Sequence, residues 1–430
     1  MILAGGKICH SLEQNDILDS LEEEINYTLS HFRLEREKVI SAVDTLGQKI
    51  LRGDFNEIIH KIAEENSQQY IKTAAEMMKR SNIEYRIHTE LGMSIREQYD
   101  IFPPYGIERV EVCMRPLGTL FHIAAGNADG LPAFSVLEGL LTGNVNILKL
   151  PSADNGLTVE IFKALIEIEP ELERYIYVFD TSSADIQAMR KMASMADGIV
   201  VWGGDEAVKA VRTLAPAGVK IIEWGHKLGF AYISGYENKG SELSALAEHI
   251  ISTRQLLCSS CQTIYIDTEN TEELESFCRD FLPYFEKEAR RNPITDIGAA
   301  AEITLKKYTA ELEIAMGGSG SRNKIFDGGG CSLTICDDSA LELSSMYGNC
   351  LVKSLPEKEI VSALRKSKGY LQTAGLICSR EKRSRLSDTL IRAGVNRIMR
   401  AGNMSADFCG ESHDGEYPLR KYIRVVNIEK

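Results

Sequence analysis

The sequence predicts an α/β protein whose first large domain is built on a doubly wound parallel sheet. Between residues 144 and 224, four short apolar segments of strand type alternate with three amphipathic segments of 10 to 14 residues. Strands that alternate with such helices run parallel, because each crossover helix returns the chain to the same end of the sheet. No period of about 20 to 50 residues recurs, which argues against a repeat protein.

Each predicted element is recognised by its residue pattern. The helices have apolar residues at helical spacing, and the strands are short apolar runs. A serine precedes the second helix as a predicted N-cap. In chain order the strands are 144–150, 174–180, 197–204 and 219–224, and the helices between them are 156–168, 183–196 and 205–214.

The flanking segments complete the α/β pattern. Residues from about 12 to 80 have helical periodicity, and the double proline in YDIFPPYG (99–106) ends it. Residues 110–127 read as a half-buried strand followed by a buried one. A second α/β segment runs from about 245 to 400, and the tail YPLRKYIRVVNIEK (417–430) is predicted to be a strand.

Composition excludes several classes of protein. The 430 residues allow two sizeable domains, with 44% hydrophobic and 26% charged residues. The net charge of −13 disfavours non-specific nucleic-acid binding. No apolar run approaches the ~18 residues of a membrane span, and the start lacks a signal-peptide pattern. The ten cysteines are scattered, so a reducing cytoplasm with free thiols is expected.

Two cysteines, Cys258 and Cys261, stand three positions apart in TRQLLCSSCQ (253–262). A zinc site needs about four ligands, and the sequence has no second C-x2-C pair and only isolated histidines. A thioredoxin-like redox pair usually opens a helix, whereas this pair precedes a predicted strand. A single nucleophilic thiol fits the local pattern better, and two small buried residues are the structural alternative.

Asn127 and Glu223 each follow an apolar strand. The amide of an asparagine in such a loop can donate a hydrogen bond to a developing oxyanion, although asparagine is also a common turn residue. The carboxyl group of Glu223 can be desolvated and act as a base, or it can simply be an exposed strand end.

Four further residues lie at predicted carboxyl ends of strands, where the ligand of a doubly wound sheet binds. Lys149 and Ser152 end the strand 144–150, and a lysine there can reach a nucleotide ribose or phosphate. Gly203 and Gly204 stand where a strand meets a helix, so their backbone amides can approach a phosphate. The turn lacks the G-x-G-x-x-G fingerprint, so it does not by itself identify a nucleotide site.

In order and spacing these pieces resemble the aldehyde dehydrogenase superfamily. Its pattern is a strand running into an asparagine, a K-P-S strand end, a glycine turn, an E-L-G-G-K segment and a cysteine about 35 residues further on. The resemblance implies that Cys258, 35 residues after Glu223, is the nucleophile and Cys261 its neighbour. The other matches are AAGN with Asn127, KLPS with Lys149 and Ser152, and WGGDEAV with Gly203 and Gly204.

A closer resemblance, over roughly residues 100–430, is to the acyl-CoA reductase (LuxC-type) family of that superfamily. Two positions depart from the pattern. Cys261 replaces the usual proline and could pair with Cys258 in a disulfide, and Ala153 replaces a glutamate that in many aldehyde dehydrogenases binds the adenosine ribose. His413 matches a family motif to which we assign no role. The matching segments are HIAAGNADG, GLLTGNVNILKLPSAD, QLLCSSCQ, LQTAGL, AGVNRIMRAGNMS and SHDGEYPLRKYIRVVNIE.

The resemblance implies an aldehyde dehydrogenase-like fold. We expect a doubly wound parallel-sheet cofactor domain, an α/β catalytic domain and a small β oligomerisation segment. The expected segments are an N-terminal helical part of the cofactor domain (1–100), the β oligomerisation segment (101–116), the NAD(P)-binding domain (117–240), the catalytic thiol domain (241–402) and a C-terminal return segment (403–430).

The resemblance also implies an activity: reduction of an acyl thioester, expected to be a fatty acyl-CoA or an acyl-enzyme, to an aldehyde. Cys258 would carry the acyl group, Asn127 would hold the oxyanion, and Glu223 would activate the thiol or handle protons. No metal is expected. Because Ala153 offers no carboxylate to repel a 2′-phosphate, the expected cofactor is NADPH. Its expected binding residues are Lys149, Ser152, Gly203 and Gly204.

Partners and rival functions follow from the same resemblance. We expect a homo-oligomer and a companion acyl-activating enzyme. One rival is an aldehyde or semialdehyde dehydrogenase that oxidises its substrate to an acid or an acyl-CoA, and a requirement for CoA discriminates it. The other is a silent or redox-sensing subunit that uses Cys258 and Cys261 as a switch, which a thiol titration with and without oxidant discriminates.

Overall fold

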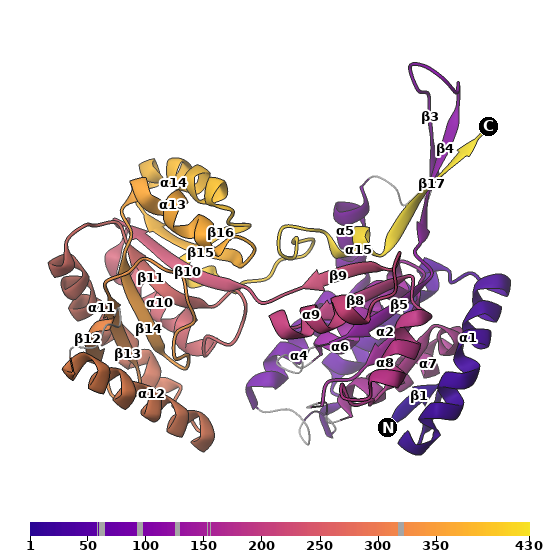
Figure 1. The fold of residues 1–430 in the computed structure, drawn as a ribbon, viewed down its shortest axis with the longest axis horizontal. Coiled ribbons are helices and arrows are strands. Elements are labelled where there is room, and N and C mark those ends of the chain that lie inside the picture. The colour runs from indigo at the N-terminus through magenta and orange to yellow at the C-terminus, as the bar shows by residue number, and fades with distance from the viewer. Residues whose placement is uncertain are drawn as a thin grey trace. The chain divides into compact units, whose positions relative to one another are not determined.

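The computed structural model describes residues 1–57, 59, 65–92, 98–124, 130–152, 154, 156–316 and 322–430. These residues form two compact units. Unit 1 comprises Met1–Gly225 and Phe408–Lys430, and unit 2 comprises His226–Asp407. In each unit helices pack on a central sheet (Figure 1). The division into five functional segments stays a prediction.

Unit 1 is organised around a seven-stranded sheet in the order β2-β1-β7-β6-β5-β8-β9. From β7 to β9 all neighbours are parallel, as predicted. The chain leaves the central β5 towards β6 and β7, then crosses over to β8 and β9. This switch point between β5 and β8 is where doubly wound sheets bind ligands. The strands are β1 (Ile2–Ala4), β2 (Lys7–Cys9), β5 (Thr119–Ile123), β6 (Val145–Lys149), β7 (Ile176–Phe179), β8 (Gly198–Trp202) and β9 (Lys220–Trp224).

The helices of unit 1 pack their apolar residues into one large core with the strands. α7 buries the stripe that its three- and four-residue spacing predicts, including Leu157, Phe162 and Leu165. α6 is predominantly apolar and is buried on nearly all sides, with 9 of its 11 residues buried. The helices are α1 (Gln14–His31), α2 (Arg36–Arg52), α4 (Glu65–Met77), α5 (Arg80–Leu91), α6 (Leu131–Leu141), α7 (Leu157–Ile168), α8 (Ile186–Ser194), α9 (Asp205–Leu214) and α15 (Pro418–Lys421).

Three local details differ from the sequence-based prediction. The cap of α8 is Asp185 rather than a serine, because the helix begins at Ile186 and the Asp185 carboxylate accepts the Ala188 N–H at 3.1 Å. The first residues form the hairpin β1–β2, which extends the sheet beside β7. The predicted C-terminal strand is preceded by the single helical turn α15.

A small antiparallel sheet of three strands also belongs to unit 1. β4 (Val110–Pro116) lies between β3 (Gln98–Ile101) and the C-terminal β17 (Ile423–Glu429). The predicted break at the double proline falls directly after β3. Figure 1 shows these strands extending away from the main sheet of the unit, so the small sheet presents two faces outside the main core.

Unit 2 contains a second seven-stranded sheet, in the order β12-β13-β14-β11-β10-β15-β16. Every neighbouring pair is parallel except the edge pair β12–β13. Two apolar clusters form its core. The strands are β10 (Leu228–Ser234), β11 (Cys261–Ile266), β12 (Arg322–Asp327), β13 (Ser332–Cys336), β14 (Asn349–Ser354), β15 (Leu371–Cys378) and β16 (Arg397–Arg400), and the helices are α10 (Lys239–Ser252), α11 (Thr271–Arg291), α12 (Ile297–Ala315), α13 (Ile360–Leu364) and α14 (Arg380–Ala393).

Candidate active site

Cys258 lies in unit 2 on the segment 253–260 between α10 and β11, which we call the nucleophile loop. All ten cysteines fall within the described part of the chain; none of them forms a disulfide there, and only Cys258 is exposed. Cys261 is fully buried in the same apolar cluster as Cys331 and Cys350. The two neighbouring cysteines therefore differ: one thiol meets solvent and the other packs in the core.

The nucleophile loop begins in an unfavourable backbone conformation. Arg254 and Gln255 have φ angles of 51° and 60°, in the left-handed region. For residues other than glycine this region costs roughly 1–3 kcal/mol each, so the surroundings must hold the conformation. On the facing segment Met346 and Tyr347 are also left-handed, and the Tyr347 N–H donates to the Arg254 carbonyl at 3.0 Å.

Two buried glutamines hold the nucleophile loop at both ends. Gln255 Nε2 donates to the carbonyl of Cys261 at 2.8 Å and to Ser344 Oγ at 3.0 Å, and its Oε1 accepts the Gly348 N–H at 3.0 Å. Gln262 Nε2 donates to the carbonyl of Gln255 at 2.7 Å, and its Oε1 accepts the Ser344 hydroxyl at 2.8 Å. These bonds satisfy groups that would be costly to bury unpaired.

Gly229, on β10, makes room for the loop. Opposite it both neighbouring strands carry one extra residue: the pairing skips Gln262 in β11 and one position within Gln372–Thr373 in β15. A Cβ atom on Gly229 would lie 2.5 Å from the carbonyl oxygen of Ser260, a backbone atom that cannot swing aside. Only glycine therefore lets the loop pass over β10.

A polar group reaches the sulfur from β15. The side-chain amide nitrogen of Gln372 lies 3.3 Å from Cys258 Sγ, within hydrogen-bonding range for sulfur. Both residues belong to unit 2, at the amino-terminal ends of its parallel strands. The site at Cys258 thus combines an exposed thiol, an anchored backbone and a neutral hydrogen-bond donor.

The strand ends of unit 1 hold the predicted cofactor-binding residues. Lys149, at the end of β6, is buried with its Nζ donating to Ser183 Oγ at 2.8 Å, and burial lowers the pKa of its ammonium group. Ser152 is exposed on the turn that follows. Gly204 caps the ten-residue helix α9, and among the described residues beyond its immediate chain neighbours no heavy atom lies within 4 Å of the place its Cβ would occupy.

This arrangement fits a dinucleotide. A buried cation, an exposed hydroxyl and the open amino end of α9 lie at the carboxyl edge of one parallel sheet, and helix amino termini favour phosphate. Gly203 ends the turn before the helix, with its N–H donating to the Trp224 carbonyl at 3.2 Å. Asp205 and Glu206 in the first turn of α9 are the opposing charges that a phosphate would meet there.

Glu223 is the second-to-last residue of β9, and both of its carboxylate oxygens accept hydrogen bonds. Arg212 of α9 donates from Nε to Oε1 at 2.5 Å and from Nη2 to Oε2 at 2.7 Å. This hydrogen bonding raises the pKa of Arg212. Within unit 1 the Glu223 carboxylate is therefore a bidentate ion-pair partner, and its role as an acid–base group stays a prediction.

Asn127 and Ala153 lie outside the described residues. Asn127 belongs to the segment between β5 and α6, and Ala153 follows Ser152. The oxyanion role of Asn127 and the influence of Ala153 on cofactor choice stay predictions. In the described part of the chain, no three His, Cys, Asp or Glu side chains gather as a metal site, and no helix is long and apolar enough to cross a membrane.

Comparison with known families identifies the chain. A sequence model described as acyl-CoA reductase (LuxC) matches residues 32–425. The chain belongs to the acyl-CoA reductase (LuxC) family. This membership confirms the predicted resemblance and the prediction of an oxidoreductase of the acyl-CoA reductase type.

Two relatives of this acyl-CoA reductase have related names. The long-chain acyl-protein thioester reductase 2 of Photobacterium leiognathi is 26% identical over 354 residues, which cover 79% of this chain and 70% of the relative. The long-chain acyl-protein thioester reductase of Aliivibrio fischeri is 24% identical over 325 residues, covering 74% of this chain and 65% of the relative. The chain thus spans about two thirds of the length of these relatives.

Solved structures confirm the predicted fold of the reductase. Lactaldehyde dehydrogenase from Escherichia coli matches with a TM-score of 0.70 and 15% identity, covering 98% of this chain and 92% of that one. An NADP-dependent glyceraldehyde-3-phosphate dehydrogenase from Bacillus halodurans C-125, complexed with NADP, matches with a TM-score of 0.71 and 14% identity, covering 100% and 98%. At these identities the likeness shows the aldehyde dehydrogenase-like fold.

His413, which the sequence left without a role, packs in this acyl-CoA reductase on two tryptophans of unit 1. Its ring centroid lies 5.1 Å from that of Trp202 and 5.0 Å from that of Trp224, at the ends of β8 and β9. The two indoles stack on one another at 5.4 Å. His413 of the SHDG motif therefore packs on the ends of β8 and β9, next to Gly203, through aromatic contacts.

Buried charges tie the C-terminal residues of the reductase to α5 and α6. Arg86 forms ion pairs with Glu90 and Glu138, whose side chains are 0% and 1% exposed. The Tyr422 hydroxyl donates to Glu138 at 3.1 Å, and the Leu419 N–H donates to Glu90 at 2.8 Å. Burial raises the pKa of Glu138. Burial would lower the pKa of Arg86, but the charges and hydrogen bonds of Glu138 and Glu90 outweigh this effect, so the pKa of Arg86 is raised.

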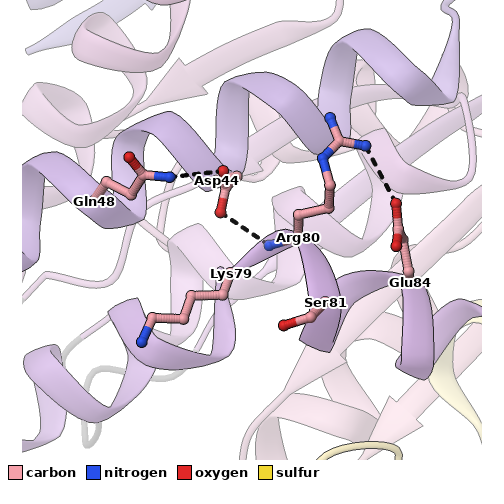
Figure 2. A pocket seen from close by; sticks show the side chains of 6 residues that line it. All are labelled: Asp44, Gln48, Lys79, Arg80, Ser81 and Glu84. Atoms are coloured by element: carbon pink, nitrogen blue, oxygen red, sulfur yellow. Dashed lines mark hydrogen bonds and ion pairs between the residues drawn. The ribbon is translucent and has the colours of Figure 1, made fainter.

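A hollow of about 550 Å³ on unit 1 of the reductase lies between α2 and α5 and is a packing feature (Figure 2). Asp44 accepts the backbone N–H of Arg80 at 2.9 Å and so caps α5, and Arg80 pairs with Glu84 at 3.2 Å. Lys79 pairs with Glu76. Partners within unit 1 therefore already pair the charged groups that line this hollow.

Sequence reasoning missed the residues that support the nucleophile: Gly229, Gln255, Gln262 and Gln372. The two amides near Cys258 offered one signal, since glutamines beside an apolar run are costly to bury without partners. No such signal marks Gln372, because its proximity to Cys258 arises from the pairing of β10 with strands from distant parts of the chain.

Proposed function

We propose that this chain reduces a long-chain acyl thioester to an aldehyde through an acyl-enzyme on Cys258, with NADPH as the reductant. The observation that carries the proposal is the exposed Cys258 thiol on its anchored loop, with an amide donor at the sulfur, in a chain of the acyl-CoA reductase family. The relatives named acyl-protein thioester reductases support the substrate class.

The residues of the chain would act in two steps. The Cys258 thiolate attacks the thioester carbonyl, forms a new C–S bond and expels the carrier as a thiolate, which takes up a proton. A bound nicotinamide dinucleotide supplies the hydride that reduces the acyl carbon. The bond to Cys258 then breaks, the sulfur keeps the electron pair as thiolate, and the aldehyde leaves. Glu223 would handle protons once its pair with Arg212 opens.

Asn127 is proposed to donate its amide to the oxyanion in both steps. Replacing Asn127 with alanine is expected to lower the chemical rate by roughly 10²-fold with a smaller effect on substrate KM. Single-turnover kinetics at saturating substrate measure the rate. If the variant instead melts earlier while its folded fraction keeps the normal rate, Asn127 is only a turn residue.

The cofactor is proposed to bind along the carboxyl edge of the unit 1 sheet, with its ribose near Lys149 and Ser152 and its phosphates near Gly203 and Gly204. Because Ala153 offers no carboxylate to the 2′-phosphate, we expect a lower KM for NADPH than for NADH. Changing Ala153 to glutamate should raise the KM for NADPH about tenfold, since like charges nearby cost on the order of 1–4 kcal/mol. Equal use of both cofactors by the unmodified chain would contradict this inference.

The test of the proposed function is oxidation of NADPH in the presence of acyl-CoAs of different chain lengths, with the aldehyde product measured. Thioester-dependent oxidation with stoichiometric aldehyde supports the reductase. Reduction of NAD(P)⁺ by free aldehydes with no requirement for CoA would instead assign an aldehyde or semialdehyde dehydrogenase.

We further propose a cytoplasmic enzyme that receives its acyl group from a companion acyl-activating enzyme and forms a homo-oligomer. The ten cysteines, none of them in a disulfide within the described part of the chain, fit a reducing compartment. The small sheet of unit 1 fits an interface between copies, because the edge strand β3 is exposed along its whole length and Phe102 beyond it is 73% exposed. Light scattering measures the oligomeric state.

A further inference from the structure

We propose that Gln372 is a catalytic residue of this reductase: its side-chain amide donates a hydrogen bond to the Cys258 sulfur and stabilises it as the thiolate. The inference rests on the proposed role of Cys258 as the nucleophile. It adds a group from β15, 114 positions along the chain, that touches the reacting atom.

The direction of the amide is fixed by its neighbour. Thr373, fully buried, donates its hydroxyl to Gln372 Oε1 at 3.3 Å, which leaves the NH₂ group facing Cys258 Sγ. Gln372 itself is only 6% exposed, and its backbone carbonyl accepts the Asn396 N–H at 3.2 Å. The donor is therefore held at the sulfur by contacts on both its side chain and its backbone.

The position of Gln372 results from the extra residue in β15. Leu371, Ala374 and Leu376 all pack in one apolar cluster. In a regular strand, residues 371 and 374 would face opposite sides, because side chains alternate with a period of two. The inserted residue lets both face the same cluster and places Gln372 outside the alternation, where it reaches the nucleophile loop. Gln262 occupies the equivalent insertion in β11.

A neutral amide suits this chemistry. The thiolate, not the thiol, is the nucleophile, and a hydrogen bond to the charged form favours ionisation. The same bond would stabilise the sulfur again when the aldehyde leaves. Gln372 donates without carrying a charge, so it stabilises the thiolate without forming an ion pair with it.

The pH dependence of Cys258 alkylation by iodoacetamide tests the proposal on the full chain, without substrate or cofactor. Mass spectrometry of the peptide containing Cys258 follows carbamidomethylation, in which the sulfur displaces iodide. We expect Gln372→Met, which keeps the length but removes the donor, to lower the alkylation rate at pH 7 about tenfold and to keep the plateau at high pH. Gln372→Glu, an isostere with a negative charge, should shift the midpoint further upward.

Gln48→Met is the matched control, because it removes the same residue type from an exposed position on α2 of unit 1, where the side-chain amide donates to Asp44 at 2.8 Å and takes no part in the nucleophile loop. Its alkylation midpoint should equal that of the unmodified chain. An unchanged midpoint in Gln372→Met would overturn the proposal, as would an equal loss of rate at every pH, which indicates altered access to the thiol. If Gln372→Met does not fold, Gln372→Leu, which also removes the donor without adding a charge, decides in the same way.

Failure of this inference is distinguishable from failure of the proposed function. A Cys258→Ala chain that still reduces thioesters would contradict the function, whatever the alkylation midpoints are. A fully active unmodified chain whose midpoint ignores the residue at 372 would contradict only the role of Gln372.

Discussion

Replacing Cys258 with alanine is expected to abolish thioester reduction, with a loss of at least about 10³-fold in kcat, because no other group can hold the acyl chain for reduction. Cys258 is exposed, so the substitution should change the free energy of unfolding by no more than about 0.5 kcal/mol. Steady-state NADPH oxidation and thermal unfolding of the same sample measure the two effects.

Cys261→Ala is the matched control for this prediction. Cys261 is the same residue type three positions away, but its thiol is buried in the core of unit 2. We expect this variant to keep its activity and to lose some stability through the small cavity. Loss of activity in the Cys261 variant alone, with Cys258→Ala still active, would reverse the assignment of the nucleophile.

Replacing Arg86 with methionine is expected to destabilise the protein by about 3–5 kcal/mol, because it leaves Glu90 and Glu138 buried without their guanidinium. Arg80→Met is the control. Arg80 is also on α5 and also pairs with two carboxylates, Glu37 and Glu84, but these pairs are exposed and screened by solvent, so this variant should lose far less stability. Urea unfolding at pH 8 compares the two variants.

The pH dependence of this effect has a definite sign. Burial raises the pKa of Glu138 in the folded state. At pH values between the pKa of the unfolded state and this raised pKa, the folded protein therefore holds a proton on Glu138 that the unfolded chain has released. Stability then falls as the pH rises through that window. Without Arg86 only the Tyr422 hydrogen bond opposes the effect of burial on Glu138, so the cost of Arg86→Met should shrink between pH 8 and pH 5. A cost independent of pH would show that lost packing, rather than unpaired charge, destabilises the variant.

The elements of the parallel sheet could be predicted because their signals are local. The pattern for residues 205–214 predicted α9 with the observed bounds, and the strands before and after it were also found. The hairpin β1–β2 and the turn α15 were missed, since segments of three or four residues carry too little periodicity. Their conformations depend on partners elsewhere in unit 1, such as β7.

The residues of the candidate site likewise fall into a group that the sequence predicts and a group that it does not. Motif order could single out Cys258, Lys149 and the glycine turn as candidates, because spacing along the chain carries that information. The left-handed conformation of Gln255 and the contact from Gln372 could not be predicted, since they arise from strand register. A single inserted residue in β15 changes which side chain contacts the sulfur. The local residue pattern of a strand does not predict where such an insertion occurs.

The discontinuous composition of unit 1 affects how the protein can be made. Residues 226–407, which form unit 2, are synthesised between the two parts of unit 1. Before residues 408–430 are synthesised, Glu90 and Glu138 lack the hydrogen bonds that Leu419 and Tyr422 later donate. At that stage β4 also lacks its neighbour β17. During translation unit 2 can therefore complete its fold first, whereas unit 1 closes its buried charges only when the last residues emerge.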